Sequence, residues 1–112
     1  MEVITVFERE PDVQAKIRFN NVRTRAVSNG YRPGHRITDD YITTGVHNYY
    51  DVDLVFPGET VSGTITFITP EEYPHTLYVG KEIDICEGER IVGSALITKI
   101  FNNLLEAFDN QL

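Results

Sequence analysis

Alternation of apolar and polar side chains is the feature that most limits how this chain can fold. It is clearest from Val13 to Phe19, where every second residue is apolar and the residues between them are polar. This period of two predicts a β-strand with one buried face. Similar runs between turn residues predict further strands at 3–7, 22–27, 41–46, 49–56, 61–68, 77–85 and 90–100. Many short strands at such spacing predict an all-β fold, a sandwich or a barrel.

The dipeptide Asn20-Asn21 separates the strand predicted over 13–19 from the one predicted over 22–27. Asparagine tolerates positive φ angles, so the pair predicts a tight turn that joins the two runs into a hairpin. One face of that hairpin would carry the basic side chains of Lys16, Arg18, Arg23 and Arg25.

One helix is predicted, at residues 101–112. Apolar side chains recur there at Phe101, Leu105, Phe108 and Leu112, a spacing that places them along one side of a helix. A helix of about three turns is only marginally stable alone in water. We therefore expect this amphipathic helix to pack on its own barrel, with a partner protein as the alternative.

The 112 residues match the size of one domain with a core large enough to fold unaided. We expect a barrel over 13–100, an additional N-terminal strand within 1–12 and the C-terminal helix at 101–112. The single cysteine, Cys86, excludes an intramolecular disulfide, and its strand-like surroundings indicate a structural thiol. No signal-peptide pattern and no apolar stretch of about 18 residues is visible, so we expect a cytoplasmic protein that does not bind membranes.

Charge is unevenly distributed along the chain. The net charge of −7 argues against non-specific nucleic-acid binding, which depends on neutralising phosphates. Residues 13–38 nevertheless contain no acid, whereas Lys81 is the only base between 39 and 89. The bases of the first segment are Lys16, Arg18, Arg23, Arg25, Arg32 and Arg36. This basic region either faces an anionic partner or pairs with acids of neighbouring strands.

Signs of catalysis are missing from the sequence. It contains no phosphate-binding glycine loop, no dinucleotide fingerprint and no nucleophile elbow. The three histidines, His35, His47 and His75, lack the short spacing of a preformed metal site. We expect a protein that is not an enzyme and that holds no metal, nucleotide or other cofactor.

Four short segments stand out by their order along the chain. They are Gly30-Tyr31-Arg32-Pro33, Thr43-Thr44-Gly45, Phe56-Pro57-Gly58-Glu59 and Glu87-Gly88-Glu89-Arg90-Ile91-Val92-Gly93. In the last segment, Gly93 removes a side chain that would block a close approach of another strand. Taken in order and at similar intervals, the segments resemble the C-terminal β-barrel domain (domain 3) of translation elongation factor Tu, over roughly residues 13–100.

The resemblance implies a closed antiparallel barrel of about six strands without catalytic activity. In that family the barrel contacts the T-stem backbone of aminoacyl-tRNA, the GTP-binding domain and the nucleotide-exchange partner. Arg23 with Thr24, and Glu87 with Gly88, match the tRNA-contacting segments. This chain departs from the family at Gly34, at Arg25-Ala26-Val27 and at Glu89, and each departure weakens the expectation of tRNA binding.

Two functions of different classes remain open at this point. The first is a protein-interaction module, which mimics the elongation-factor domain or neutralises something that targets it. The second is a structured-RNA-binding module in a translation-related role. The candidate binding residues for either function are Lys16, Arg18, Arg23, Thr24, Arg25, Arg32, Glu87, Gly88 and Arg90.

Overall fold

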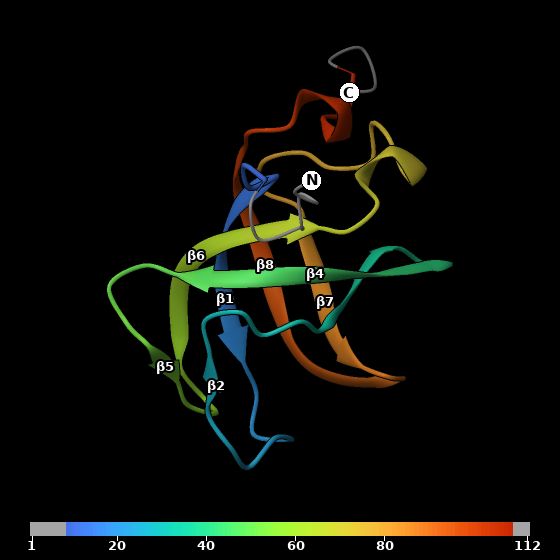
Figure 1. Ribbon diagram of the computed structural model, residues 1–112. Helices are drawn as coiled ribbons and strands as arrows, with labels where there is room; N and C mark the ends of the chain where they lie inside the picture. The colour runs from blue at the N-terminus through green and yellow to red at the C-terminus, as the bar shows by residue number, and fades with distance from the viewer. Residues whose placement is uncertain (1–8, 109–112) are drawn as a thin grey trace, which may run out of the picture.

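A closed barrel of six strands forms the protein in the computed structural model, which describes residues 9–108 (Figure 1). Around the barrel the order is β1-β6-β4-β3-β7-β8, and each neighbouring pair for which a register is given is antiparallel. The strands are β1 (Val13–Phe19), β3 (Gly34–Thr38), β4 (Tyr41–Tyr49), β6 (Thr60–Phe67), β7 (Glu82–Glu87) and β8 (Arg90–Ile100). The predicted closed antiparallel six-stranded barrel is confirmed. The strand predicted at 3–7 lies outside the described residues.

The core follows directly from the alternation in β1. Its inward side chains, Val13, Ala15, Ile17 and Phe19, are at most 2% exposed. They join inward residues of the other strands in one apolar cluster. Each large apolar side chain buried in this way contributes roughly 1.5–3 kcal/mol. The core therefore lies inside the barrel, and the charged side chains of β1 lie on its outer wall.

The predicted hairpin between 13–19 and 22–27 is wrong. Both edges of β1 are occupied, one by β6 and the other by β8, so no edge is left for a hairpin partner. Residues 20–26 instead form an irregular loop, in which the Asn20 side chain accepts a hydrogen bond from the Val22 backbone N–H. The loop leads to β2 (Val27–Ser28), which pairs with β5 (Leu54–Val55) in a small separate sheet.

Other predicted strand limits also shift. The run predicted at 41–46 continues to Tyr49 as one long strand, β4. This strand ends before Asp51, which has a positive φ of 63°, and only the short β5 forms in the rest of the run predicted at 49–56. The run predicted at 77–85 begins as a strand only at Glu82, because a turn from Tyr78 to Lys81 precedes it. The strand β3 was not predicted. By contrast, β6 and β8 lie within a residue of their predicted limits.

The predicted C-terminal helix is also wrong over the described residues. Instead of an α-helix, the structure has a single 3-10 turn, η3 (Asn103–Leu105), and residues 109–112 lie outside the description. The Asn102 side chain accepts a hydrogen bond from the Leu104 N–H and so caps this short turn. Leu105 is fully buried in the barrel core, so this segment does pack on its own barrel.

Two strands approach each other closely where Gly93 of β8 faces Phe19 of β1. A Cβ atom at Gly93 would lie 2.2 Å from the Arg18 carbonyl oxygen, which no side chain can tolerate. The prediction that Gly93 permits a close approach is confirmed. A second 3-10 turn, η2 (Pro70–Glu72), lies between β6 and β7. Among residues 9–108, no helix has the length and apolarity to cross a bilayer.

Candidate functional site

Residues from two distant parts of the sequence meet at the lower end of the barrel in Figure 1. The 20–26 loop contributes Arg23 and Arg25, and the tight turn between β7 and β8 contributes Glu87 and Arg90. We call Arg23, Arg25 and Arg90 the arginine cluster. Gly88 takes a φ of 63° in the β7–β8 turn, a backbone conformation that glycine adopts without strain.

The Glu87 carboxylate pairs with two members of the arginine cluster, Arg23 and Arg90. One of its oxygens accepts hydrogen bonds from Arg23 Nη1 and, at 2.5 Å, from the Tyr31 hydroxyl. The other oxygen accepts from Arg90 Nη2 at 2.9 Å. Desolvation acts to raise the pKa of Glu87, but these hydrogen bonds and the charge of Arg23 outweigh it and lower the pKa. The carboxylate is therefore ionised and balances part of the positive charge.

Tyr31 connects this surface to the barrel core. Its ring packs edge-on against Phe19 at 5.9 Å and against His47 at 5.6 Å, while the Arg23 guanidinium lies 5.3 Å from its centroid. Burial and the hydrogen bond to Glu87 raise the pKa of its hydroxyl, so Tyr31 stays a donor at neutral pH. Arg23 is thus held between a carboxylate and an aromatic ring, which fixes its position.

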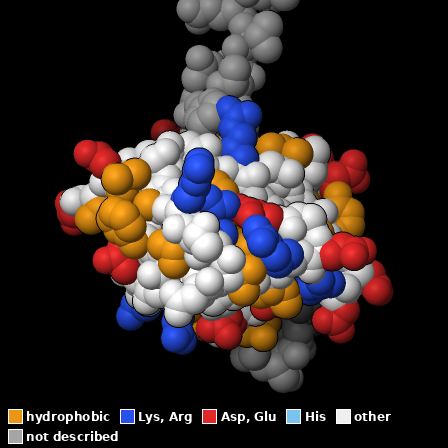
Figure 2. Space-filling view, turned by 90° about the horizontal axis from the view of Figure 1, so that it is seen from below, with side chains coloured by type: hydrophobic (Ala, Val, Ile, Leu, Met, Phe, Trp, Pro, Cys, Tyr) orange, Lys and Arg blue, Asp and Glu red, His pale blue; other side chains and the backbone are white. Residues whose placement is uncertain are grey.

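The remaining members of the arginine cluster are accessible. Arg25 is exposed, and the Arg90 side chain is 55% exposed, compared with 21% for Arg23. A cavity of about 220 Å³ lies between them, lined by Val22, Arg23, Thr24, Arg25 and Arg90. Figure 2 shows basic side chains interspersed with acidic and apolar ones on the face seen from below. The surface can receive a carboxylate or another planar oxyanion.

The other predicted binding residues lie elsewhere. Lys16 and Arg18 are exposed on the outer wall of β1, where they face β6 and β8 across the ladder, and they line no part of the 220 Å³ cavity. Arg32 is exposed in the segment before β3. The structure thus brings together Arg23, Thr24, Arg25, Glu87 and Arg90 but does not gather all nine candidates on one face.

A buried hydrogen-bonded chain inside the barrel escaped prediction. His35 of β3 and His47 of β4 are fully buried, and their Nε2 atoms are 2.8 Å apart. Because the Thr43 carbonyl oxygen can only accept, His35 Nδ1 donates to it at 3.3 Å. His47 Nε2 therefore donates to His35 Nε2, and His47 Nδ1 accepts from the Tyr49 hydroxyl at 3.0 Å. The predicted strands at 41–46 and 49–56 left His47 between them, and only the structure places His47 and Tyr49 two residues apart on one strand, where they share a face.

Burial determines the chemistry of both histidines. Desolvation lowers the pKa of His35 to about 4, although its hydrogen bond to Thr43 acts in the opposite direction. Desolvation also lowers the pKa of His47 well below its ordinary value, and the charge of His35 adds to this effect. Both rings are therefore neutral at physiological pH, and we interpret the hydrogen-bonded chain from Thr43 to Tyr49 as a structural part of the core.

Other reactive groups are few in the described part of the chain. Cys86 is buried, and desolvation raises the pKa of its thiol, as a structural cysteine requires. Within residues 9–108, no three side chains of His, Cys, Asp or Glu are arranged to hold a metal ion. No model of a known protein family matches the sequence.

Proposed function

We propose that this protein is a non-catalytic, protein-binding module that meets an acidic partner through the arginine cluster. The observation that carries the proposal is the grouping of three arginines beside one cavity, two of which, Arg23 and Arg90, pair with Glu87. Arg23 is immobilised on Tyr31 and Glu87, while Arg25 and Arg90 present exposed guanidinium groups beside a small cavity. Preorganised arginine next to an aromatic residue is typical of the residues that dominate protein interfaces.

Apolar neighbours support a protein partner. Val22 is 46% exposed and lines the cavity, and Ile91, which follows Arg90 in β8, is 44% exposed. A protein interface buries such apolar area together with charged side chains, whereas contact with a phosphate backbone needs mainly cations. The mixture of apolar and charged groups at this end of the barrel therefore fits a protein surface better.

Binding of structured RNA is the second candidate, and the clustering of three arginines is the observation that favours it. Two features oppose it. Glu87 neutralises part of the cluster, and Glu89, exposed in the same turn, adds another negative charge. The net charge of −7 also repels RNA at long range. We therefore rank protein binding first.

The kinship to the elongation factor Tu C-terminal domain is likewise our proposal. Its support is the six-stranded barrel together with the ordered segments, of which Gly30-Tyr31-Arg32-Pro33 and the β7–β8 turn both contribute to the Glu87 network. In this proposal the protein acts in the cytoplasm, where it mimics the elongation-factor domain or protects that factor from an attacker. Such a translation-related role needs no GTPase domain in this chain.

A charge-removal experiment tests the choice between the two candidates. The double variant Arg25→Gln/Arg90→Gln removes the exposed members of the arginine cluster and keeps Arg23. Lys16→Gln/Lys99→Gln removes the same charge from exposed positions outside the cluster and serves as the matched control. Chemical cross-linking in the cells that produce the protein identifies a partner, which is then purified for binding kinetics, and purified tRNA serves as the RNA probe.

We expect Arg25→Gln/Arg90→Gln to slow association with that partner about tenfold at low salt, because such charges steer encounter. The control should associate at the wild-type rate, and tRNA should stay unbound at physiological salt. The proposal fails if wild-type protein binds tRNA at micromolar affinity, with a log–log salt slope of roughly −0.7 to −0.9 per phosphate that flattens in the cluster variant. Equal association rates for both variants would also refute it.

A further inference from the structure

The seam between β3 and β7 is paired over the fewest residues of any seam in the barrel. Its register covers only Gly34↔Cys86 and His35↔Ile85. Both strands continue past this point, β3 to Thr38 and β7 back to Glu82, without further register between them. By comparison, β7 and β8 are in register from Glu82 to Glu87. The two strands of the weak seam therefore diverge at one end.

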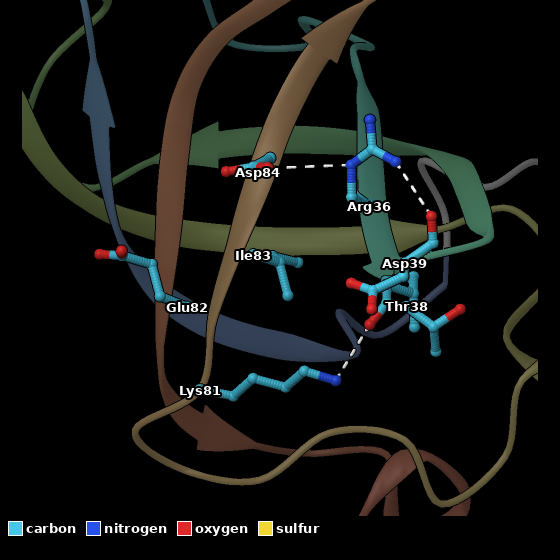
Figure 3. Close-up of a pocket in the computed structure, with 8 residues that line it drawn as sticks. Arg36, Thr38, Asp39, Lys81, Glu82, Ile83 and Asp84 are labelled. Atoms are coloured by element: carbon cyan, nitrogen blue, oxygen red, sulfur yellow. Dashed lines mark hydrogen bonds and ion pairs between the residues drawn. The ribbon is translucent and has the colours of Figure 1, made fainter.

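A cleft of about 360 Å³ opens where these strands diverge (Figure 3). Residues 36–39 line it on one side and residues 81–84 on the other. Ile37 and Ile83 are almost completely buried in the barrel core behind the cleft. Its volume falls within the roughly 300–1,000 Å³ of known ligand sites. An extended main chain has the narrow shape that a gap between two strands can hold.

Lys81 spans the cleft in place of a strand partner. Its ammonium group donates to the Ile37 carbonyl oxygen at 3.0 Å and to the Thr76 carbonyl oxygen at 2.8 Å. Figure 3 shows this side chain reaching across toward β3. The Ile37 carbonyl, part of the backbone of β3, therefore accepts a hydrogen bond from a side chain that reaches across the cleft. Desolvation lowers the pKa of Lys81.

The charges around the cleft favour a basic occupant. Its acidic side chains are Asp39, Glu82 and Asp84, and its basic ones are Arg36 and Lys81. Both bases are already engaged, because Arg36 contacts the Asp84 carboxylate at 3.8 Å and donates to the Asp39 carbonyl oxygen. Within residues 9–108, no hydrogen bond is made by the carboxylates of Asp39 and Glu82, both of which are exposed. Asp39 already attracts the charge of Lys81, but among the described residues its carboxylate accepts no hydrogen bond, so a cation brought by a ligand can donate to it.

We propose that the open end of the β3–β7 seam is a second binding site, which takes an extended, basic peptide segment of a partner protein. The segment adds to β3 as a short strand, and one of its backbone N–H groups takes the place of the Lys81 ammonium at the Ile37 carbonyl. A lysine or arginine side chain of the segment lies against Asp39. This site is separate from the arginine cluster, so binding at one does not require the other.

A reversible closure of the seam provides the test. Arg36 and Asp84 are the next pair in the register that Gly34↔Cys86 and His35↔Ile85 begin. A disulfide in the variant Arg36→Cys/Asp84→Cys, made in a Cys86→Ala background to prevent mispairing, closes the cleft when oxidised and reopens it when reduced. The probe is a pool of heptapeptides with lysine at alternate positions and Val, Ile or Thr between them. The same pool with glutamate instead of lysine is its control.

We expect the lysine pool to bind the wild-type protein and the reduced variant, and to lose at least tenfold in affinity for the oxidised variant. Amide signals of residues 36–38 and 82–84 should shift on binding and exchange more slowly with solvent. Asp39→Asn should weaken binding several-fold, while Arg25→Gln/Arg90→Gln should leave it unchanged. Absence of binding to the wild-type protein, equal binding of the glutamate pool, or equal binding to the oxidised and reduced variants would each overturn the proposal.

Discussion

Acid should destabilise this barrel through its buried histidines, His35 and His47. In the folded protein the pKa of His35 is lowered to about 4, whereas an unfolded chain protonates histidine near 6.5. Between these values the unfolded state binds a proton that the folded state rejects, so stability falls as the pH falls. The difference corresponds to about 3 kcal/mol, present in full above pH 6.5 and lost by about pH 4. The lowered pKa of His47 acts in the same direction.

The geometry explains why the folded protein resists protonation. Each ring is fully buried, and the Nε2 atoms of His35 and His47 share one proton across 2.8 Å. A second proton would turn that contact into a repulsion between two N–H groups. The other neighbours are the Tyr49 hydroxyl, the Thr43 carbonyl and the rings of Phe19, Tyr31 and Phe67, and none of these groups carries a negative charge that would stabilise a cation.

Urea unfolding measured from pH 7 to pH 4 checks this prediction. Carboxylates also titrate in this range, so the informative quantity is the difference between the wild-type protein and His35→Gln/His47→Gln. Between pH 7 and pH 4, the unfolding free energy of the wild type should fall by at least about 3 kcal/mol more than that of the double variant, whatever the stability of the double variant at pH 7. His75 is half-buried and does not belong to the hydrogen-bonded chain of His35 and His47. The variant His75→Gln should therefore keep the wild-type dependence of stability on pH. The reasoning is refuted if the double variant and the wild type lose stability equally.

Three further predictions concern stability. Gly93→Ala should lower the melting temperature strongly, because its Cβ would meet the Arg18 carbonyl at 2.2 Å; an unchanged melting curve would contradict the close approach. Tyr31→Phe should reduce the unfolding free energy by about 1 kcal/mol in denaturant titration, because Glu87 loses a hydrogen bond while the ring packing remains. An unchanged unfolding free energy would show that this hydrogen bond does not stabilise the fold. Deleting residues 101–112 removes the fully buried Leu105 from the core and should reduce the unfolding free energy by roughly 1.5–3 kcal/mol, as measured by calorimetry. No loss of stability would mean that this segment does not support the barrel.

The candidate site was only partly predictable. The sequence singled out Arg23, Thr24, Arg25, Glu87 and Arg90 by charge and by resemblance, and the structure places them together. The sequence did not indicate that Glu87 neutralises part of the arginine cluster or that the Tyr31 hydroxyl donates to Glu87, because these contacts join residues more than fifty positions apart. The cleft at Lys81 forms where β3 and β7 diverge. The alternation of side chains within one strand does not show where that strand separates from its neighbour, so the sequence did not predict the cleft.

Local sequence determined those features that depend on neighbouring residues alone. The alternation in β1 and β8 predicted their extent closely, because one buried face imposes a period of two whatever the strand's partners are. Tertiary structure decided the rest. Both edges of β1 are occupied by β6 and β8, so residues 22–26 have no strand to pair with, and pairing resumes only where Val27 of β2 meets β5. Tertiary structure also turned the C-terminal segment into a 3-10 turn, since backbone hydrogen bonds with Leu77, at Leu105 and Ala107, outweigh those of a short helix that is marginal in water.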